Sequence, residues 1–237
     1  EVLDGAVVTA GGVLTLRALS NTDGTVSADG RAVGVADAEG RMPPAASVGI
    51  GAAVAINLVS SQGVARLGLA EHAAGGAVIE AVTPDVAAVL AGGAEAARVD
   101  SLSARANSGA GATDVGIAGA VALNLVDASS LAEIASDAGL ALSGGGDLRL
   151  GSDRRMTAVA EAISDAAAAG GSVGVGASVA LNIVALRSRA ELSDGVSVSG
   201  AGAVALVARG ENAVTTTANA GSAGGVSVTP ALALSLV

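Results

Sequence analysis

A twelve-residue segment present in four copies constrains this chain more than any other feature. It reads VGIGAAVAINLV at 48–59, VGIAGAVALNLV at 115–126 and VGVGASVALNIV at 173–184, with a divergent copy, VSVTPALALSLV, at 226–237. Such internal repetition is typical of architectures in which each repeat packs against its neighbours. The copies start 67 (48 to 115), 58 (115 to 173) and 53 (173 to 226) residues apart. We therefore expect one unit with loop insertions, the longest between the first two copies.

Bulky and small side chains alternate within each copy. In the first copy the even-numbered residues are mainly Val, Ile and Leu, whereas the odd-numbered residues from 49 to 57 are Gly, Ala and Asn. A period of two is the mark of a β-strand, whose successive side chains point to opposite faces. Strands that are apolar on both faces are normally covered on both, so we expect both faces of these strands to be buried.

The face of small residues is a candidate packing or assembly surface, because side chains this small allow close approach. Either solenoids meet laterally there to build a fibre, or the face packs within the same chain. Its members in the first three copies are Gly49, Gly51, Ala53, Ala55, Gly116, Ala118, Ala120, Ala122, Gly174, Gly176, Ser178 and Ala180.

Asparagine recurs at one position of the repeat. Asn57, Asn124 and Asn182 occupy it in the first three copies, and Ser235 takes their place in the fourth. In stacked coils equivalent residues lie above one another, so the side-chain amides can form a ladder. We interpret these asparagines as structural rather than catalytic.

A second unit, with a short strand, a Gly-rich turn and another short strand, occurs at residues 4–18, 137–150 and 194–208. Residues 155–169 are rich in Ala, the best helix former. Their small residues nevertheless occur at every second position, which favours a strand. Units of about 55 residues built from such strands predict an all-β fold, a parallel β-solenoid (β-helix) of degenerate repeats.

The repeat boundaries divide the chain into one continuous solenoid. We expect a partial repeat at 1–47, a repeat with an insertion at 48–114, repeats at 115–172 and 173–225, and a partial repeat at 226–237. Because solenoids need polar caps and neither end has one, we expect an excerpt from a longer array.

Composition excludes several classes of chemistry. The chain has no Cys, Phe, Tyr or Trp, and its net charge is −10. The missing cysteines exclude disulfides and thiolate metal sites, and an acidic chain without aromatic side chains disfavours nucleic acid as a partner. The longest apolar run, at 172–186, is too short and Gly-rich for a membrane-spanning helix.

No residue points to catalysis. Ser178 stands in a sequence, GASVA, that faintly resembles a nucleophile elbow, but Ala53, Ala120 and Ala231 take its place in the other copies. His72 is the single histidine and is interpreted as a surface loop residue. Arg154 and Arg155 are interpreted as a solvated pair. We predict no catalytic, cofactor-binding or metal-binding residue.

Calcium is the one cofactor alternative, and a weak one. Residues 144–153, GGGDLRLGSD, partly match the nonapeptide of calcium-binding β-rolls, but the glycine spacing differs and no tandem copy follows. Asp23, Asp29, Asp37 and Glu39 form an acidic stretch. Asp residues that form turns are the simpler interpretation of both.

The motif VGVGASVALNIV, followed by a short acidic, Gly-containing hairpin and an Ala/Thr-rich stretch, resembles repeats of large bacterial filamentous adhesins and haemagglutinin-like exoproteins. These include leukotoxin-family adhesins and autotransporter passenger domains. The resemblance covers essentially the whole chain. It implies an extended β-solenoid stalk at the bacterial cell surface or outside the cell, with roles in adhesion, biofilm or extracellular matrix.

The expected partners are other copies of the chain, laterally or end to end, and a host or matrix surface contacted through other regions. Two alternatives stay open. One is a laterally assembling filament subunit. The other is a fragment of a polysaccharide-processing β-helix enzyme, which the lack of aromatic sugar platforms disfavours.

Overall fold

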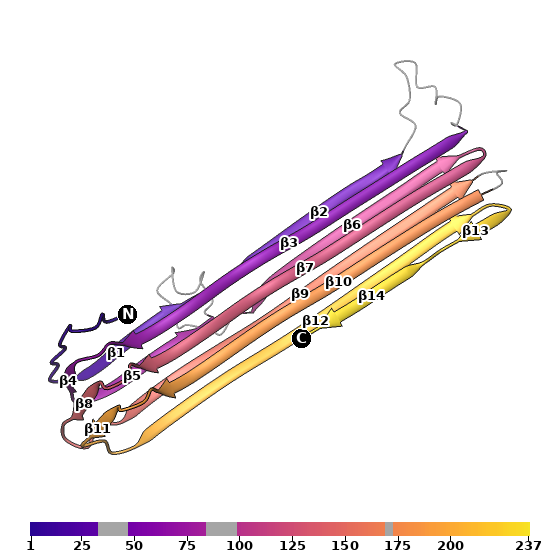
Figure 1. Cartoon of the computed structure of the whole chain (residues 1–237). Coiled ribbons are helices and arrows are strands. Elements are labelled where there is room, and N and C mark those ends of the chain that lie inside the picture. Colours follow the sequence, from indigo (N-terminus) through magenta and orange to yellow (C-terminus); the bar gives the residue numbers. More distant parts are fainter. Residues whose placement is uncertain (33–46, 84–98, 169–172) are drawn as a thin grey trace.

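The fold is a stack of parallel β-coils (Figure 1). The structure, a computed structural model, describes residues 1–32, 47–83, 99–168 and 173–237. All the named elements in these residues are β-strands, and every pairing between them is parallel. The predicted parallel β-solenoid is therefore confirmed.

Three sheets form the walls of the solenoid, and we call them the repeat sheet, the facing sheet and the short sheet. The repeat sheet holds β3 (Val48–Leu67), β7 (Val115–Ile134), β10 (Val173–Leu192), β13 (Val226–Val228) and β14 (Ala231–Leu236). The facing sheet holds β1 (Val13–Leu19), β2 (Asp23–Ala32), β5 (Gly76–Val82), β6 (Asp100–Ala112), β9 (Leu148–Ala168) and β12 (Val204–Ala223). The short sheet holds β4 (Glu71–Ala74), β8 (Gly139–Leu142) and β11 (Ser197–Ser199).

Each coil passes from the repeat sheet through the short sheet to the facing sheet, and the next coil repeats the path. The copies of the twelve-residue segment stack in register, so that Val48, Val115, Val173 and Val226 form one row. The segment is the first part of a longer strand, since β3, β7 and β10 each run for 20 residues.

Two details of local structure were open in the sequence. Residues 155–168 lie within strand β9, so the strand prediction for the Ala-rich stretch is confirmed over these residues. The expected hairpin is wrong. β8 and the start of β9 flank a Gly-rich turn, but β8 pairs with β4 and β11, whereas β9 pairs with β5 and β12. Stacking on the neighbouring coil replaces pairing across the turn.

The insertion between the first two copies enters in the middle of the facing sheet. β5 ends at Val82 opposite Asp153, and β6 begins at Asp100 opposite Met156. In the next coil β9 runs through this point without a break, whereas in the preceding coil the sheet is also broken here, because β1 ends at Leu19 and β2 begins at Asp23.

The interior changes character along the strands. Near the short sheet it is filled by large side chains, among them Leu67, Ile134 and Leu150. Toward the first residues of β3, β7 and β10 it narrows to alanines contributed by the repeat and facing sheets. Figure 1 shows the short strands β4, β8 and β11 together at one end of the molecule, with the long strands extending from it. The solenoid is three-sided at that end and a thin two-layer structure at the other.

Candidate functional site

The face of small residues lies inside the chain, against the facing sheet. Ala55, Ala122 and Ala180 are completely buried. A Cβ atom on Gly51 would overlap the carbonyl oxygens of Gly109 and Gly30, so only glycine fits there. Of the two alternatives for this face, the structure therefore shows packing within the chain. Lateral assembly through these residues is wrong, because the facing sheet already covers them.

The bulky side of the same strands is exposed, which contradicts the expectation that both faces are covered. Leu58 is 76% exposed and Ile50 66% exposed, although both side chains are aliphatic. Small residues are inside because the backbones of the two sheets are in contact there, and this leaves the branched residues outside. We call this surface the aliphatic face. Its most exposed members are Val48, Ile50, Val54, Ile56, Leu58, Ile117, Leu125, Val226, Val228, Leu232, Leu234 and Leu236.

The aliphatic face consists of rows that run across the strands. Five rows carry Val, Ile or Leu in every coil, for example Ile56, Leu123, Leu181 and Leu234. One row is small and contains Ala52, Gly119 and Ala177. A Cβ atom on Gly119 would meet no other atom within 4 Å. The small row is therefore a shallow trough, and a hollow of about 160 Å³ lies at its end beside Pro230.

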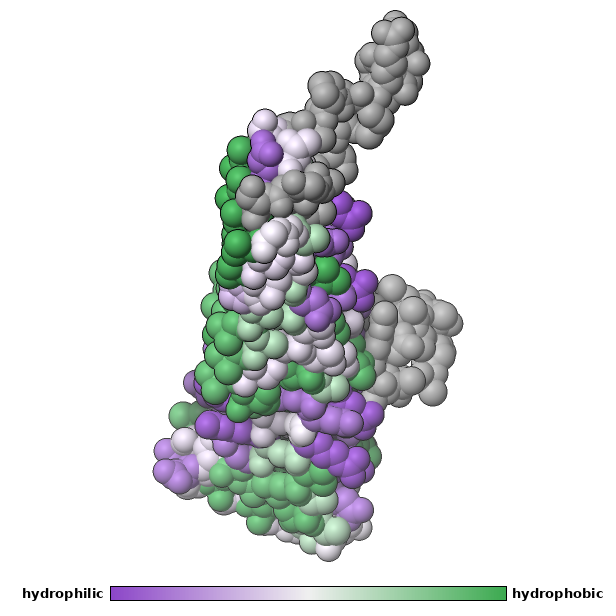
Figure 2. Space-filling model, turned by 90° about the vertical axis from the view of Figure 1, so that its right-hand side faces the viewer, coloured by the Kyte–Doolittle hydropathy of each residue, from purple (hydrophilic) through white to green (hydrophobic). Residues whose placement is uncertain are grey.

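The aliphatic face has a sharp border along the strands. The twelve-residue segments that form it contain no charged residue. Immediately beyond it, in the same outward phase, follow Ser60 on β3, Asp127 on β7 and Ala185 on β10, and Arg187 is the next outward residue of β10. Arg187 Nη1 lies 2.8 Å from Asp127 Oδ1. Figure 2 shows hydrophobic residues along one margin of the molecule and hydrophilic residues gathered elsewhere.

The outer side of the facing sheet carries charged side chains, and ion pairs between neighbouring strands neutralise them. Glu80 on β5 lies 2.9 Å from Arg17 on β1 and 3.5 Å from Arg149 on β9. Arg105 and Glu161 form a similar pair between β6 and β9, at 3.4 Å. The two outer surfaces of the solenoid therefore differ in chemistry, and the aliphatic face is the one without charge.

The three asparagines of the repeat form a ladder inside the thin part of the solenoid. Asn57 Nδ2 donates to Asn124 Oδ1 at 2.9 Å, and Asn124 Nδ2 donates to Asn182 Oδ1 at 2.7 Å. Each also donates to a backbone carbonyl of the facing sheet, at Ser103, Val159 and Thr215. Asn182 continues the ladder to Thr216, which contacts Ser235. The amides thus join coil to coil and sheet to sheet.

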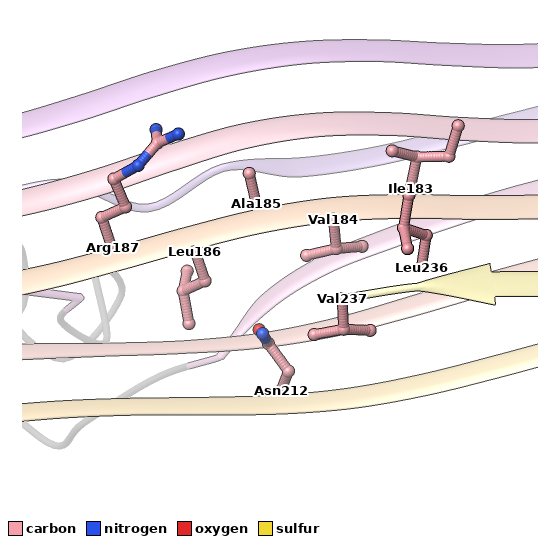
Figure 3. Close-up of a pocket in the computed structure, with 8 residues that line it drawn as sticks. All are labelled: Ile183, Val184, Ala185, Leu186, Arg187, Asn212, Leu236 and Val237. Atoms are coloured by element: carbon pink, nitrogen blue, oxygen red, sulfur yellow. The ribbon is translucent and has the colours of Figure 1, made fainter.

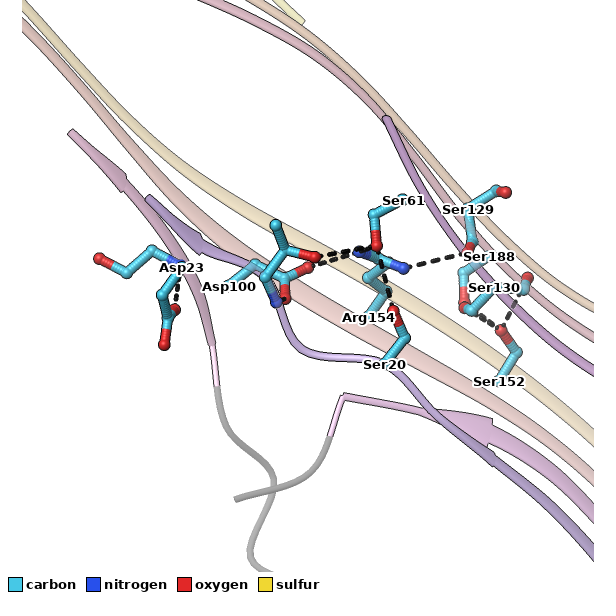
Figure 4. Close-up of polar contacts among 11 residues, drawn as sticks. Ser20, Asp23, Ser61, Asp100, Ser129, Ser130, Ser152, Arg154 and Ser188 are labelled. Atoms are coloured by element: carbon cyan, nitrogen blue, oxygen red, sulfur yellow. Dashed lines mark hydrogen bonds and ion pairs between the residues drawn. The ribbon is translucent and has the colours of Figure 1, made fainter. Parts of the chain in front are cut away.

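Arg154 is fully buried, which corrects its interpretation as part of a solvated pair. Its Nη2 lies 2.8 Å from Asp100 Oδ2, and both side chains are 0% exposed. It also donates to the Ser129 carbonyl and to Ser61 Oγ (Figure 4). Burial raises the pKa of Asp100, opposed by the hydrogen bond from the Thr22 backbone and by the Arg154 charge. Arg155 points outward and pairs with Asp153 and Glu211.

This ion pair occurs once and marks the break in the facing sheet. Gly210 stands opposite Arg154 in the following coil, and Asp100 is the first residue of β6. Beside it Ser130, Ser152 and Ser188 form a chain of hydroxyl contacts of 2.6 Å (Figure 4). One feature of the sequence could have predicted the pair: Arg154 occupies a position of its strand whose side chain points inward. The feature is hard to recognise, because the neighbouring inward positions carry small residues.

Two other residues weighed in the sequence have structural roles. His72 lies in β4 and is 2% exposed, so its interpretation as a surface loop residue is wrong. Its Nδ1 accepts from the Val8 backbone at 3.2 Å, and its Nε2 lies 2.9 Å from the Gly68 carbonyl. Ser178 is buried, donates to the Asn219 carbonyl at 2.6 Å and lies 2.9 Å from Ser164 Oγ. Neither side chain reaches solvent.

Hollows and carboxylates offer little chemistry in the part of the chain that the structure describes. A hollow of about 330 Å³ beside β10 has Arg187 and Asn212 as its polar side chains, and the rest of its lining is apolar (Figure 3). No group of three or more His, Asp or Glu residues among the described residues is placed to hold a metal ion. Of the acidic stretch considered for calcium, Asp37 and Glu39 lie outside those residues, and Asp23 accepts from the Ser101 backbone.

Residues 144–153 form a turn and the beginning of β9, with Gly144 and Gly145 at positive φ. The described residues contain no helix long and apolar enough to cross a membrane. Comparison of the chain with protein-family models, with curated proteins and with solved structures found no match.

Proposed function

We propose that this chain is a structural segment of a bacterial repeat protein exported to the cell surface or beyond it, where it acts as a stalk or fibre-forming element in adhesion or matrix building. The observation that carries the proposal is the in-register stacking of equivalent residues through successive coils, joined by the asparagine ladder. Coils of this kind can be added without limit, each lengthening the stack by ~4.8 Å.

The distribution of polar groups supports a scaffold rather than a catalyst. Among the described residues the fully buried charges, Arg154 and Asp100, bind each other, and the outer ion pairs connect neighbouring strands. No specific contact in the described residues favours the alternative of a polysaccharide-processing enzyme. The similarity of the repeat to filamentous adhesins and exoproteins supports the location outside the cell.

Surface location is tested on intact cells of the source bacterium. Antibodies raised against the purified chain should label unpermeabilised cells or their secreted matrix, and brief protease treatment of intact cells should remove the signal. A cytoplasmic protein labelled in parallel controls for lysis. Labelling that appears only after permeabilisation would exclude the proposed role.

A further inference from the structure

We infer that the aliphatic face is a lateral interface, on which a second copy of this chain packs face to face with its strands antiparallel to the first. The inference deepens the proposed structural role and relies on it only for its biological setting. It assigns self-association to the exposed face of the repeat sheet, not to the face of small residues, which is inside.

The aliphatic face is large enough for a specific interface. It spans eleven residues, or ten residue-to-residue steps, along each strand, from Val48 to Leu58 in the first coil, and the strands of four coils. At ~3.3 Å per residue and ~4.8 Å per strand this gives about 600 Å², the upper end of the largest patches on monomeric proteins. Two copies would bury about 1,200 Å², the lower end of specific interfaces.

The aliphatic face is uncharged, which suits it to contact with a second copy of an acidic chain. The chain has a net charge of −10, yet the segments of the aliphatic face contain no charged residue. Face-to-face packing therefore buries no charge and leaves the acidic groups at the periphery. An anionic membrane is a poorer match, because the face offers no Arg or Lys to its headgroups and the whole chain is acidic.

The relief of the aliphatic face is complementary to itself in one orientation. Along each strand the outward rows are bulky at Val48 and Ile50, small at Ala52, and bulky at Val54, Ile56 and Leu58. We number these rows from one (Val48) to six (Leu58), so that the small row is the third. If the strands of the second copy are antiparallel and the two copies are related by an axis between the third and fourth rows, the small row of each copy packs against the bulky fourth row of the other. A parallel arrangement would place small row against small row and leave a void, which is costly.

The antiparallel arrangement places equivalent rows in predictable pairs. The second row, which contains Ile117, faces the fifth row of the other copy, which contains Leu123. The first row likewise faces the sixth, represented by Val115 and Leu125 on β7. These pairs provide positions for cross-linking, because the chain contains no cysteine of its own.

Sedimentation velocity over a range of protein concentrations tests the pairing. The unaltered chain should form a concentration-dependent dimer. Val121→Lys, in the fourth row, should raise the dimer dissociation constant roughly a hundredfold, because a charge would be buried without a partner. The matched control is Leu131→Lys, in the same phase of β7 beyond the border of the face, which should leave the dimer unchanged. Far-UV circular dichroism of both variants checks the fold.

Cross-linking tests the orientation. A mixture of Ile117→Cys and Leu123→Cys proteins should form a mixed disulfide, and each protein alone should form little. Self-linking of the two proteins without mixed product would overturn the antiparallel arrangement.

A chain that stays monomeric at all concentrations, or a dimer that Leu131→Lys disrupts equally, would overturn the interface. A monomer that floats with phosphatidylcholine vesicles would show a lipid occupant and overturn it as well. None of these results affects the labelling of intact cells, so failure of the interface and failure of the proposed function are distinguishable.

Discussion

Asn124 donates to two acceptors that belong to different parts of the solenoid, Asn182 Oδ1 in the next coil and the Val159 carbonyl in the facing sheet. It also accepts from Asn57. A single side chain therefore joins three coils and two sheets in an interior that otherwise offers alanine contacts.

Replacement of Asn124 with Ala should destabilise the fold. The change removes one of the two acceptors of Asn57 Nδ2, and Asn182 Oδ1 and the Val159 carbonyl each lose a donor. Buried polar groups left without partners cost about 1–3 kcal/mol, so we expect a loss of about 3 kcal/mol in the free energy of unfolding by urea. Asn57→Ala, at the end of the ladder, should cost less. Equal losses for both variants would contradict a role of the ladder as a connected unit.

Replacement of Ala120 with Leu tests the close contact of the two sheets. Ala120 is 1% exposed and packs among alanines of the repeat and facing sheets. Overpacking should cost about 1–3 kcal/mol of unfolding free energy, measured by urea titration. The control is Gly119→Ala on the adjacent outward position, where an added Cβ meets nothing within 4 Å. An Ala120→Leu protein as stable as the control would mean that the interior is not closely packed.

The Arg154–Asp100 pair should show strong coupling. Arg154→Met leaves Asp100 buried without a counter-charge, which should cost about 3–5 kcal/mol. Asp100→Asn in the same protein should recover most of that loss, because both charges are then absent and Asn keeps an acceptor for the Thr22 backbone. Urea denaturation of the two single variants and the double variant gives the coupling. Additive losses would show that the two side chains do not act as a pair.

The pH dependence of stability should carry the signature of Asp100. Burial raises its pKa above the ordinary 3.8, so the folded state binds this proton more tightly than the unfolded state. The contribution of Asp100 to stability is therefore complete below 3.8 and is lost as the pH rises through the folded-state pKa. Over that window the unfolding free energy of the unaltered chain should fall relative to that of Asp100→Asn. Urea titrations from pH 3 to 7 measure the difference, and a relative rise would contradict the assigned direction.

The fold could be predicted because its strongest signals are local and repeated. The alternation of Val48 to Leu58 with Gly49 to Asn57 predicts an extended strand, and its recurrence predicts stacking. Which side faces inward could not be predicted, because bulky aliphatic residues normally point to a core. The decisive fact is the backbone contact at Gly51, which depends on Gly30 and Gly109 in the facing sheet, 21 and 58 positions away (51 − 30; 109 − 51).

The buried polar residues were harder to predict than the strands. Asn124 was recognised because it recurs, whereas Arg154 and His72 each occur in one coil and have no periodic signal. Their partners, Asp100 and the Val8 backbone, lie 54 and 64 positions away (154 − 100; 72 − 8). Only the stacking of coils brings them together.

Thiol accessibility measures the orientation of the repeat strand most directly. Ile56→Cys should react with a maleimide at nearly the rate of a free thiol in dilute protein, since Ile56 is 51% exposed. Ala55→Cys, one residue away and 0% exposed, should react only when urea unfolds the chain. Rapid labelling at residue 55 with protection at residue 56 would contradict the inward small face, and with it the outward aliphatic face.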